Sequence, residues 1–154
     1  VRDLEGNTLV LFNYIEKHGE PLYDLINSNV KENRKVFFVH GGTEVEDREE
    51  VRLLTEQEDN AIIVASYGTF STGINIKRLH NIVFASPSKS RIRNLQSIGR
   101  VLRRGEGKTI ATLYDIADDI GGQNYTIKHL NERVNIYNEE NFKYEVIKVN
   151  LRAT

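Results

Sequence analysis

Five short runs of apolar residues recur along the chain, and they are rich in the β-branched and aromatic residues that favour strands. Two of them, at 9–12 and 62–65, are apolar without interruption, which is typical of strands covered on both faces of a sheet. The pattern therefore predicts five strands, at residues 8–13, 36–40, 61–67, 81–86 and 109–116.

Stretches with helical periodicity follow these runs. In residues 21–29, leucine and isoleucine recur at helical spacing, and Pro21 stands in the first turn, where its missing N–H costs nothing. Thr43 and Glu46 have the spacing of a capping box, so a second helix is expected to begin there. Beyond the last run, the pattern predicts a turn-rich connection at 118–122, a helix over 125–140 and a terminal strand over 142–149.

Buried strands that alternate with amphipathic helices are typical of crossover connections between parallel strands. The expected fold class is α/β, a three-layer arrangement around a mainly parallel sheet. At 154 residues, without a composition break, the chain is expected to form a single domain over 1–154. Open sheets of this kind bind ligands at the carboxyl ends of their strands, but they host many functions, so the motifs must decide the function.

Composition excludes several classes of protein. With no cysteine and four scattered histidines, neither a disulfide framework nor a structural zinc site is expected. No apolar run approaches the roughly 20 residues that cross a bilayer, and the start has no signal-peptide pattern. A cytoplasmic protein is therefore expected, in the host cell if it is phage-encoded. The chain contains no methionine, which would fit a segment of a longer protein.

The formal net charge of −1 hides a strong segregation of charge. Residues 44–59 hold eight acids and two arginines, whereas residues 88–108 hold seven basic residues and one acid. A basic block can be a solvated helix face or a surface that binds phosphates, and charge alone leaves both readings open.

A phosphate-binding loop is suggested by Gly107-Lys108-Thr109 but is rejected on two grounds. The position that should hold the first glycine is Leu102, and the segment precedes a strand instead of joining a strand to a helix. Asp118-Asp119, which could suggest a metal pair, is interpreted as part of a turn. No metal site is expected in this chain.

The segment before this false loop has a helical arrangement of arginines. At about 100° per residue, one stripe collects Gln96, Gly99, Arg100 and Arg103, opposite a stripe of Leu95, Ile98 and Leu102. Two guanidinium groups at i and i+3 on a rigid face suit the equatorial oxygens of a γ-phosphoryl group.

The string from Gln96 to Arg103 resembles motif VI of superfamily 2 helicases, Gln-x-x-Gly-Arg-x-x-Arg. Residues 65–75 resemble motif V, 9–14 resemble motif IV, and 38–43 resemble the strand-end loop that touches the nucleic-acid backbone in that family. These motifs occur in the family's order within residues 7–117, and the overall likeness extends to phage recombination and repair DNA helicases. The resemblance implies a RecA-like (P-loop NTPase-like) C-terminal motor domain.

The resemblance also implies roles for individual residues. Arg100 and Arg103 would act in catalysis as arginine fingers, and Gln96, Gly73 and Asn75 would bind the nucleotide. Two departures from the motif V pattern are Ser66, which keeps the hydroxyl of the usual threonine, and Asn75, which lacks the usual carboxylate. The residues expected to contact the nucleic-acid backbone are Gly41, Gly42, Thr43, Ser66, Tyr67, Thr69 and Thr72.

A domain of this kind would be one of the two motor domains that together form the ATP site of a helicase. ATP with Mg²⁺ would be held mainly by an N-terminal RecA-like domain of the same protein, and the substrate would be DNA as a single strand, duplex or branched junction, with RNA an open alternative. Because it lacks a P-loop, the isolated domain is expected to be inactive as an ATP hydrolase. The alternative functions are a non-catalytic nucleic-acid-binding or regulatory module and, less well supported, a nucleotide-dependent transferase.

Overall fold

A computed structural model describes residues 1–42, 44–70, 78–85, 111–117, 125–139 and 142–150 of the chain. Strands and helices alternate along it, as the sequence pattern predicts. In chain order the elements are β1 (Thr8–Phe12), a π-helical turn η1 (Ile15–Gly19), α1 (Glu20–Asn29), β2 (Val36–Val39), α2 (Glu44–Gln57), β3 (Ile62–Ser66), a 3₁₀ turn η2 (Tyr67–Phe70), β4 (Asn81–Phe84), β5 (Thr112–Asp115) and α4 (Tyr125–Glu139).

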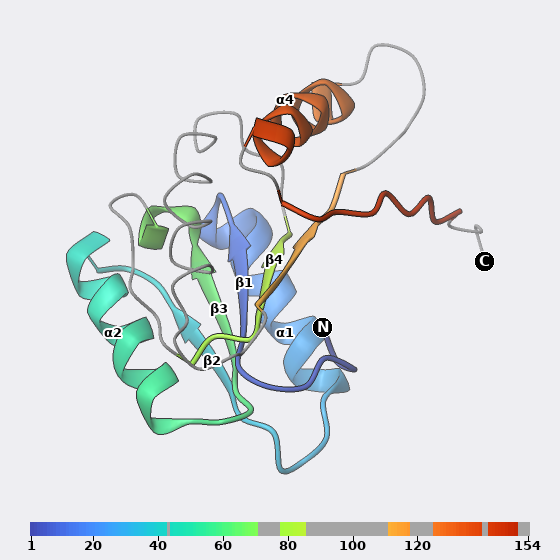
Figure 1. Cartoon of the computed structure of the whole chain (residues 1–154). Helices are drawn as coiled ribbons and strands as arrows, with labels where there is room; N and C mark the ends of the chain where they lie inside the picture. Colours follow the sequence, from blue (N-terminus) through green and yellow to red (C-terminus); the bar gives the residue numbers. More distant parts are fainter. Residues whose placement is uncertain (43, 71–77, 86–110, 118–124, 140–141, 151–154) are drawn as a thin grey trace.

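The five strands form one parallel sheet in the order β2-β3-β1-β4-β5. The central strand β1 pairs with β3 on one side and β4 on the other, with Val10 level with both Val64 and Val83. Because all strands run the same way, their carboxyl ends meet at one edge of the sheet, at the top of Figure 1. The parallel α/β fold expected from the sequence is confirmed.

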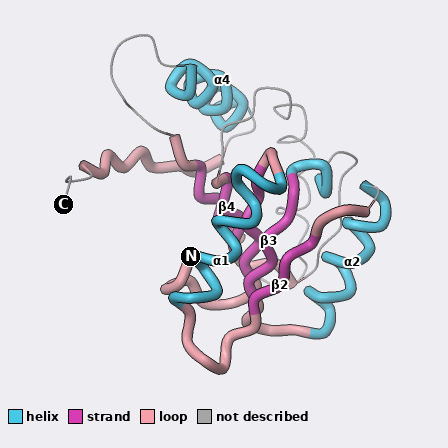
Figure 2. Tube along the Cα trace, turned by 180° about the vertical axis from the view of Figure 1, so that it is seen from behind, coloured by secondary structure: helices cyan, strands magenta, loops and turns pink. Residues whose placement is uncertain are grey.

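Helices cover both faces of the sheet, and side chains of β1 alternate between them. Val10 and Phe12 join the core cluster that includes Ile26 of α1. Leu9 and Leu11 belong to the other cluster, with Val51 of α2 and Tyr137 of α4. The three layers can be followed from opposite sides in Figures 1 and 2, where α1 lies on one face and α2 on the other.

The buried amide of Asn7 ties the amino end of the sheet together. Its Oδ1 accepts a hydrogen bond from the N–H of Ala61 at 3.0 Å, and its Nδ2 donates to the carbonyls of Glu58 at 2.6 Å and Arg78 at 3.0 Å. A third donor contact, to the carbonyl of Thr55, measures 3.3 Å. One side chain therefore joins the start of β1 to the segments that precede β3 and β4.

Gly6, immediately before Asn7, has a φ of +86° and lies against His80. A Cβ on Gly6 would come within 2.5 Å of the imidazole Cγ of His80, whose Nδ1 in turn accepts a hydrogen bond from the Asn7 N–H at 3.2 Å. Both the backbone conformation and the close ring make glycine necessary here. His80 therefore has a structural role at the amino end of the sheet.

The terminal strand predicted for 142–149 is wrong. Residues 142–150 have no regular secondary structure, and the side chains of Val146, Ile147 and Val149 are 71%, 72% and 72% exposed. Their β-branched character favours an extended backbone, but a strand also needs a neighbouring strand, and no strand of the described sheet pairs with this segment.

Smaller differences concern the ends of elements. Tyr67, expected as the last residue of a strand, begins the 3₁₀ turn, and the helix expected to reach residue 140 is described to Glu139. The helix expected near Thr43 begins at Glu44, while Thr43 lies outside the described residues. Among the helices that the structure describes, none is long and apolar enough to cross a membrane.

We predict that Asn7→Ala lowers the free energy of unfolding by about 2–4 kcal/mol. The substitution removes a buried amide and leaves one N–H and several carbonyls without this partner, and each unsatisfied buried group costs about 1–3 kcal/mol. Urea denaturation of the chain measures the loss. Asn29→Ala is the control, because that exposed amide makes a single contact with the carbonyl of Leu25, and its effect should stay within about 0.5 kcal/mol. Equal losses would contradict the role of Asn7.

Candidate functional site

Two of the predicted contact segments emerge side by side at the carboxyl edge of the sheet. β2 and β3 are hydrogen-bonded neighbours, with Val39 level with Ala65. The chain therefore leaves β2 through Gly41 and Gly42 next to the place where it leaves β3 through Ser66, at a separation of about 5 Å between neighbouring strands. Segments 25 residues apart in the sequence share the edge at which open α/β sheets bind ligands.

Gly41 combines an unusual backbone conformation with open surroundings. Its φ is +81°, a value that strains any residue with a side chain, and a Cβ placed on it would meet no atom of the described residues within 4 Å. Glycine is needed here for the turn and not for lack of room. The main chain at Gly41 is consequently accessible to a ligand from outside.

Gly42, the next residue, is crowded by acidic side chains from the first turn of α2. A Cβ on Gly42 would lie 2.9 Å from Oδ1 of Asp47 and 3.0 Å from Oε2 of Glu46. Carboxylates at a helix amino end are stabilised by the exposed N–H groups and the helix dipole. A phosphate that approached this helix start would therefore have to compete with two carboxylates.

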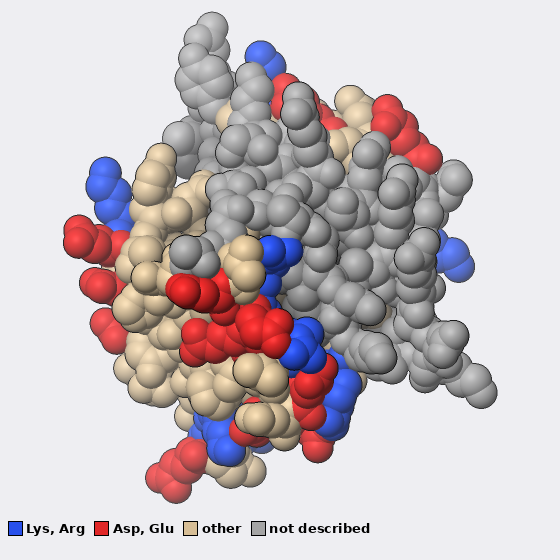
Figure 3. Space-filling view, turned by 90° about the vertical axis from the view of Figure 1, so that its left-hand side faces the viewer, with Lys and Arg blue, Asp and Glu red and all other residues tan. Residues whose placement is uncertain are grey.

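The outer face of α2 carries charges of both signs. Figure 3, which looks onto the side of the molecule that carries α2, shows acidic side chains gathered beside basic ones. On this helix Arg52 forms ion pairs with Glu49 and with Glu56, the latter at 2.7 Å. The acidic block of residues 44–59 is thus largely a solvated helix with its own counter-charges.

The turn after β3 directs its side chains into the protein. Tyr67 is 6% exposed and meets Phe84 edge-on, with ring centroids 5.5 Å apart and an interplanar angle of 64°. Thr69 is fully buried, and its Oγ1 has no hydrogen-bond partner among the described residues. A ligand at this turn would meet the main chain and the half-buried Ser66 before it met either of these side chains.

A buried polar cluster lies at the carboxyl end of β5, and we call it the Asp115 cluster; it consists of Asp115, Arg133 and Tyr137. The guanidinium of Arg133 donates from Nε to Oδ2 of Asp115 at 2.6 Å and from Nη2 to Oδ1 at 2.8 Å. The Tyr137 hydroxyl donates to Oδ2 at 2.6 Å. The Arg133 side chain is 4% exposed and that of Asp115 is 10% exposed, so this fork is held away from water.

The environment of the Asp115 cluster shifts two pKa values. Burial acts to lower the pKa of Arg133, but the hydrogen bonds and charge of Asp115, with further contributions from Tyr137 and Tyr67, raise it. Burial, the charge of Asp115 and the hydrogen bond to it raise the pKa of Tyr137. Arg133 therefore stays a charged guanidinium and Tyr137 a neutral phenol across the physiological pH range.

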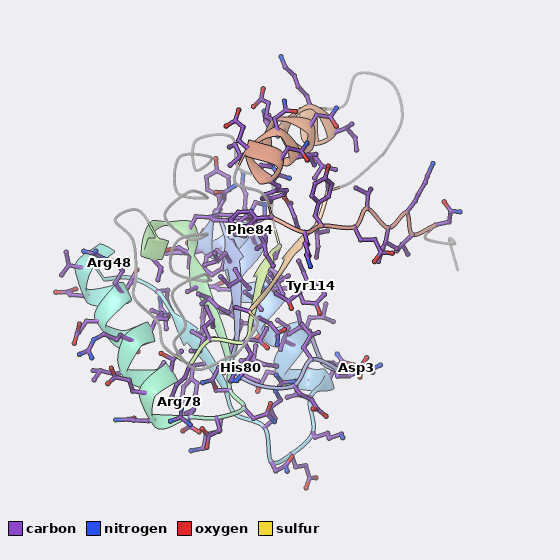
Figure 4. The ribbon with its side chains drawn as sticks, in the orientation of Figure 1. Asp3, Arg48, Arg78, His80, Phe84 and Tyr114 are labelled. Atoms are coloured by element: carbon purple, nitrogen blue, oxygen red, sulfur yellow. The ribbon has the colours of Figure 1, made fainter. Side chains whose placement is uncertain are left out.

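The sequence reading missed the Asp115 cluster. The available signal was weak: Arg133 and Tyr137 are four residues apart, so they share one side of α4, and that side also carries apolar residues such as Val134. The Asp115 cluster lies at the carboxyl end of the sheet. In Figure 4, Phe84 lies at this end, which faces α4, whereas His80 and Arg78 lie at the opposite end.

All five residues assigned to catalysis and nucleotide binding lie outside the described part of the chain, and their roles remain predictions. These residues are Gly73, Asn75, Gln96, Arg100 and Arg103, together with Thr43 and Thr72 from the expected nucleic-acid contacts. Within the described ranges, no three His, Asp or Glu side chains gather into a group that could hold a metal ion.

Three comparisons with known proteins agree. Residues 2–105 match the family model described as the helicase conserved C-terminal domain. The chain is 41% identical over 160 residues to the ATP-dependent DNA helicase uvsW of Enterobacteria phage T4, in an alignment that covers 96% of this chain and 31% of that protein. The crystal structure of T4 UvsW matches with a TM-score of 0.66 and 39% identity, over 90% of this chain and 30% of that one. The chain thus spans about a third of the length of these relatives.

We predict that Thr69→Val raises the free energy of unfolding by about 1 kcal/mol, because it removes a buried hydroxyl that lacks a partner among the described residues. Denaturant unfolding of the chain measures the change. The matched control is Thr55→Val, since Thr55 is equally buried but its hydroxyl donates to the carbonyls of Val51 and Arg52, each at 2.9 Å. That variant should lose stability. A loss at Thr69 as large as the loss at Thr55 would mean that the Thr69 hydroxyl has a partner.

Proposed function

Because this chain belongs to the helicase conserved C-terminal domain family, we propose that it is the second motor domain of an ATP-dependent superfamily 2 DNA helicase. The observation that carries the proposal is the family match over residues 2–105, supported by 41% identity to a relative named as an ATP-dependent DNA helicase. DNA is the proposed substrate because that relative is named for it. The parallel sheet supports the proposal because it brings the two expected contact turns to one edge.

The nucleic-acid contacts of this motor are assigned to the turns after β2 and β3, which begin at Gly41 and Ser66. Their neighbouring positions at the edge of the sheet suit two contacts with one strand of nucleic acid. Contacts of main-chain and hydroxyl groups with phosphate and sugar carry no sequence information, so the grip would be independent of sequence. Cycles of closure and opening between the two motor domains would move these contact turns along the nucleic-acid backbone, which is translocation. Translocation would lead to unwinding of a duplex or remodelling of a branched junction.

ATP would be bound between this domain and an N-terminal RecA-like domain of the same protein, which would supply the phosphate loop and the Mg²⁺ ligands. When bound there, Mg²⁺ would supply positive charge to offset the negative charge that develops in phosphoryl transfer. Arg100 and Arg103 would contact the γ-phosphoryl group, and Gln96, Gly73 and Asn75 would line the nucleotide site. The proposed place of action is the cytoplasm, which is that of the host cell if the protein is phage-encoded.

We predict that the 154-residue chain alone hydrolyses no ATP and binds it weakly, because the described residues offer neither a glycine-rich phosphate cradle nor a set of metal ligands. Phosphate release with and without single-stranded DNA measures turnover, with the complete protein as the positive control. DNA-stimulated ATP hydrolysis by the isolated chain would contradict the proposal that another domain supplies the phosphate loop and the Mg²⁺ ligands.

The arginine pair provides the sharper test of the motor function. In the complete protein, Arg100→Ala and Arg103→Ala should each lower ATP turnover by about 10³-fold or more, since arginine fingers act on transition-state charge. Lysine should not rescue either position, because a point charge does not reproduce a planar fork of donors. The salt dependence of DNA binding without nucleotide should remain nearly unchanged.

Arg104→Ala is the internal control, because Arg104 is adjacent in sequence but falls outside the Arg100 and Arg103 stripe expected for a helix. It should have a much milder effect on turnover. A different outcome would be that each of the three substitutions lowers the slope of log DNA affinity against log salt concentration by about one, while ATP turnover persists at saturating DNA. The three arginines would then bind DNA phosphates, as expected of a non-catalytic binding module.

A further inference from the structure

The Asp115 cluster is an unusual way to hold a helix against a sheet. A buried ion pair pays a desolvation cost for both charges, and a well-packed apolar pair of similar volume is often at least as stable. Here the carboxylate of Asp115 accepts both prongs of the Arg133 fork and also the Tyr137 hydroxyl. The cluster provides a fixed geometry, which apolar packing alone does not impose.

That geometry reaches the turn after β3. Tyr137 belongs to the same buried cluster as Tyr67 and Phe84, and the Tyr67 ring packs edge-on against Phe84. Phe84 is in turn level with Asp115 on the neighbouring strand β5, so the Tyr67–Phe84 contact lies beside the Asp115 cluster. The first residue of η2 thus packs against the end of β4, next to the strand end that carries the Asp115 cluster.

Displacement of α4 would be costly. If α4 moved away from β5, the hydrogen bonds of Arg133 and Tyr137 with Asp115 would break, and a charge that stayed in the buried site without its partner would be strongly destabilising. Because Asp115 is level with Phe84, against which Tyr67 packs, the displacement would also disturb the surroundings of Tyr67. The position of α4 and the conformation of η2 are therefore coupled.

We propose that Arg133 is a positioning residue, which, locked by Asp115 and Tyr137, fixes the 3₁₀ turn Tyr67–Phe70 in the conformation that contacts DNA. This proposal rests on the proposed function, since α4 would order the turn after β3, which is one of the two proposed DNA contacts. Arg133 touches neither DNA nor nucleotide in this scheme. Its effect on DNA contact passes through Tyr67.

The test uses the complete protein with Arg133→Lys, which keeps the charge and most of the length but loses the two-pronged fork. Amide hydrogen exchange within Tyr67–Phe70 should become at least about tenfold faster, while exchange in β2 stays unchanged. The concentration of single-stranded DNA that gives half-maximal ATP turnover should rise by about tenfold, and kcat at saturating DNA should change less than about twofold. Tyr137→Phe, which removes one hydrogen bond and keeps the ring, should show the same pattern at about threefold.

Two further variants separate positioning from folding. Arg52→Lys is a matched control, because Arg52 makes exposed ion pairs on α2, and it should change none of these quantities. If Arg133→Lys folds poorly, the double variant Asp115→Leu, Arg133→Met replaces the buried pair by apolar groups and is expected to fold. It should still show the raised half-maximal DNA concentration.

The outcomes are distinguishable. Unchanged exchange in Tyr67–Phe70 would overturn the positioning role, and faster exchange with an unchanged half-maximal DNA concentration would overturn its link to DNA contact. A lowered kcat without a change in the half-maximal DNA concentration would indicate a merely structural role and would also overturn the proposal. Absence of DNA-stimulated turnover in the unmodified complete protein would instead overturn the proposed function, while the exchange measurement would still decide whether Arg133 orders the turn.

Discussion

The architecture depends on the complete burial of β1. This strand has parallel neighbours on both sides and helices over both faces, so its residues from Thr8 to Phe12 are inaccessible to water. A strand in this position must satisfy every main-chain group through its neighbours, and it must present apolar side chains alternately to both layers. The three layers and the parallel order follow from that requirement, because parallel neighbours need crossover connections that pass over the faces.

Because the strands are parallel, all amino ends lie at one end of the sheet and all carboxyl ends at the other, and the two ends have different roles. At the amino end, the Asn7 amide and the imidazole of His80 satisfy main-chain groups where the chain enters the strands, and this end is built for stability. At the carboxyl end, the turns after β2 and β3 emerge as neighbours, and one of them has an open main chain at Gly41. The proposed ligand contacts lie at the carboxyl end, where the main-chain groups of these turns do not pair within the sheet.

Buried polar groups fix the geometry at both ends. Asn7 links the starts of several strands, whereas the fork between Arg133 and Asp115 links α4 to the edge strand β5. Such groups tolerate few alternative arrangements, because each lost partner leaves an unsatisfied donor or acceptor in a dry site. At the carboxyl edge Tyr67 packs against Phe84, which is level with Asp115 on β5, and the proposed positioning role of Arg133 follows from this arrangement.

The sequence by itself determined the parts of this protein that depend on local pattern. Short apolar runs identified the five strands, helical spacing and capping signals identified α1, α2 and α4, and the motif resemblance identified the family, because periodicity and short motifs are encoded in neighbouring residues. The roles of Arg100 and Arg103 remain predictions from that resemblance.

Only the tertiary structure decided what depends on distant partners. Residues 142–149 have the composition of a strand yet form none, since strand formation requires a partner strand that local composition cannot supply. Thr69 is a small polar residue in a turn and is nevertheless fully buried. The pairing of Asp115 with Arg133 spans 18 positions and depends on where α4 packs. Burial and polar pairing are set by the packing of whole elements, and the pattern within one element does not contain that information.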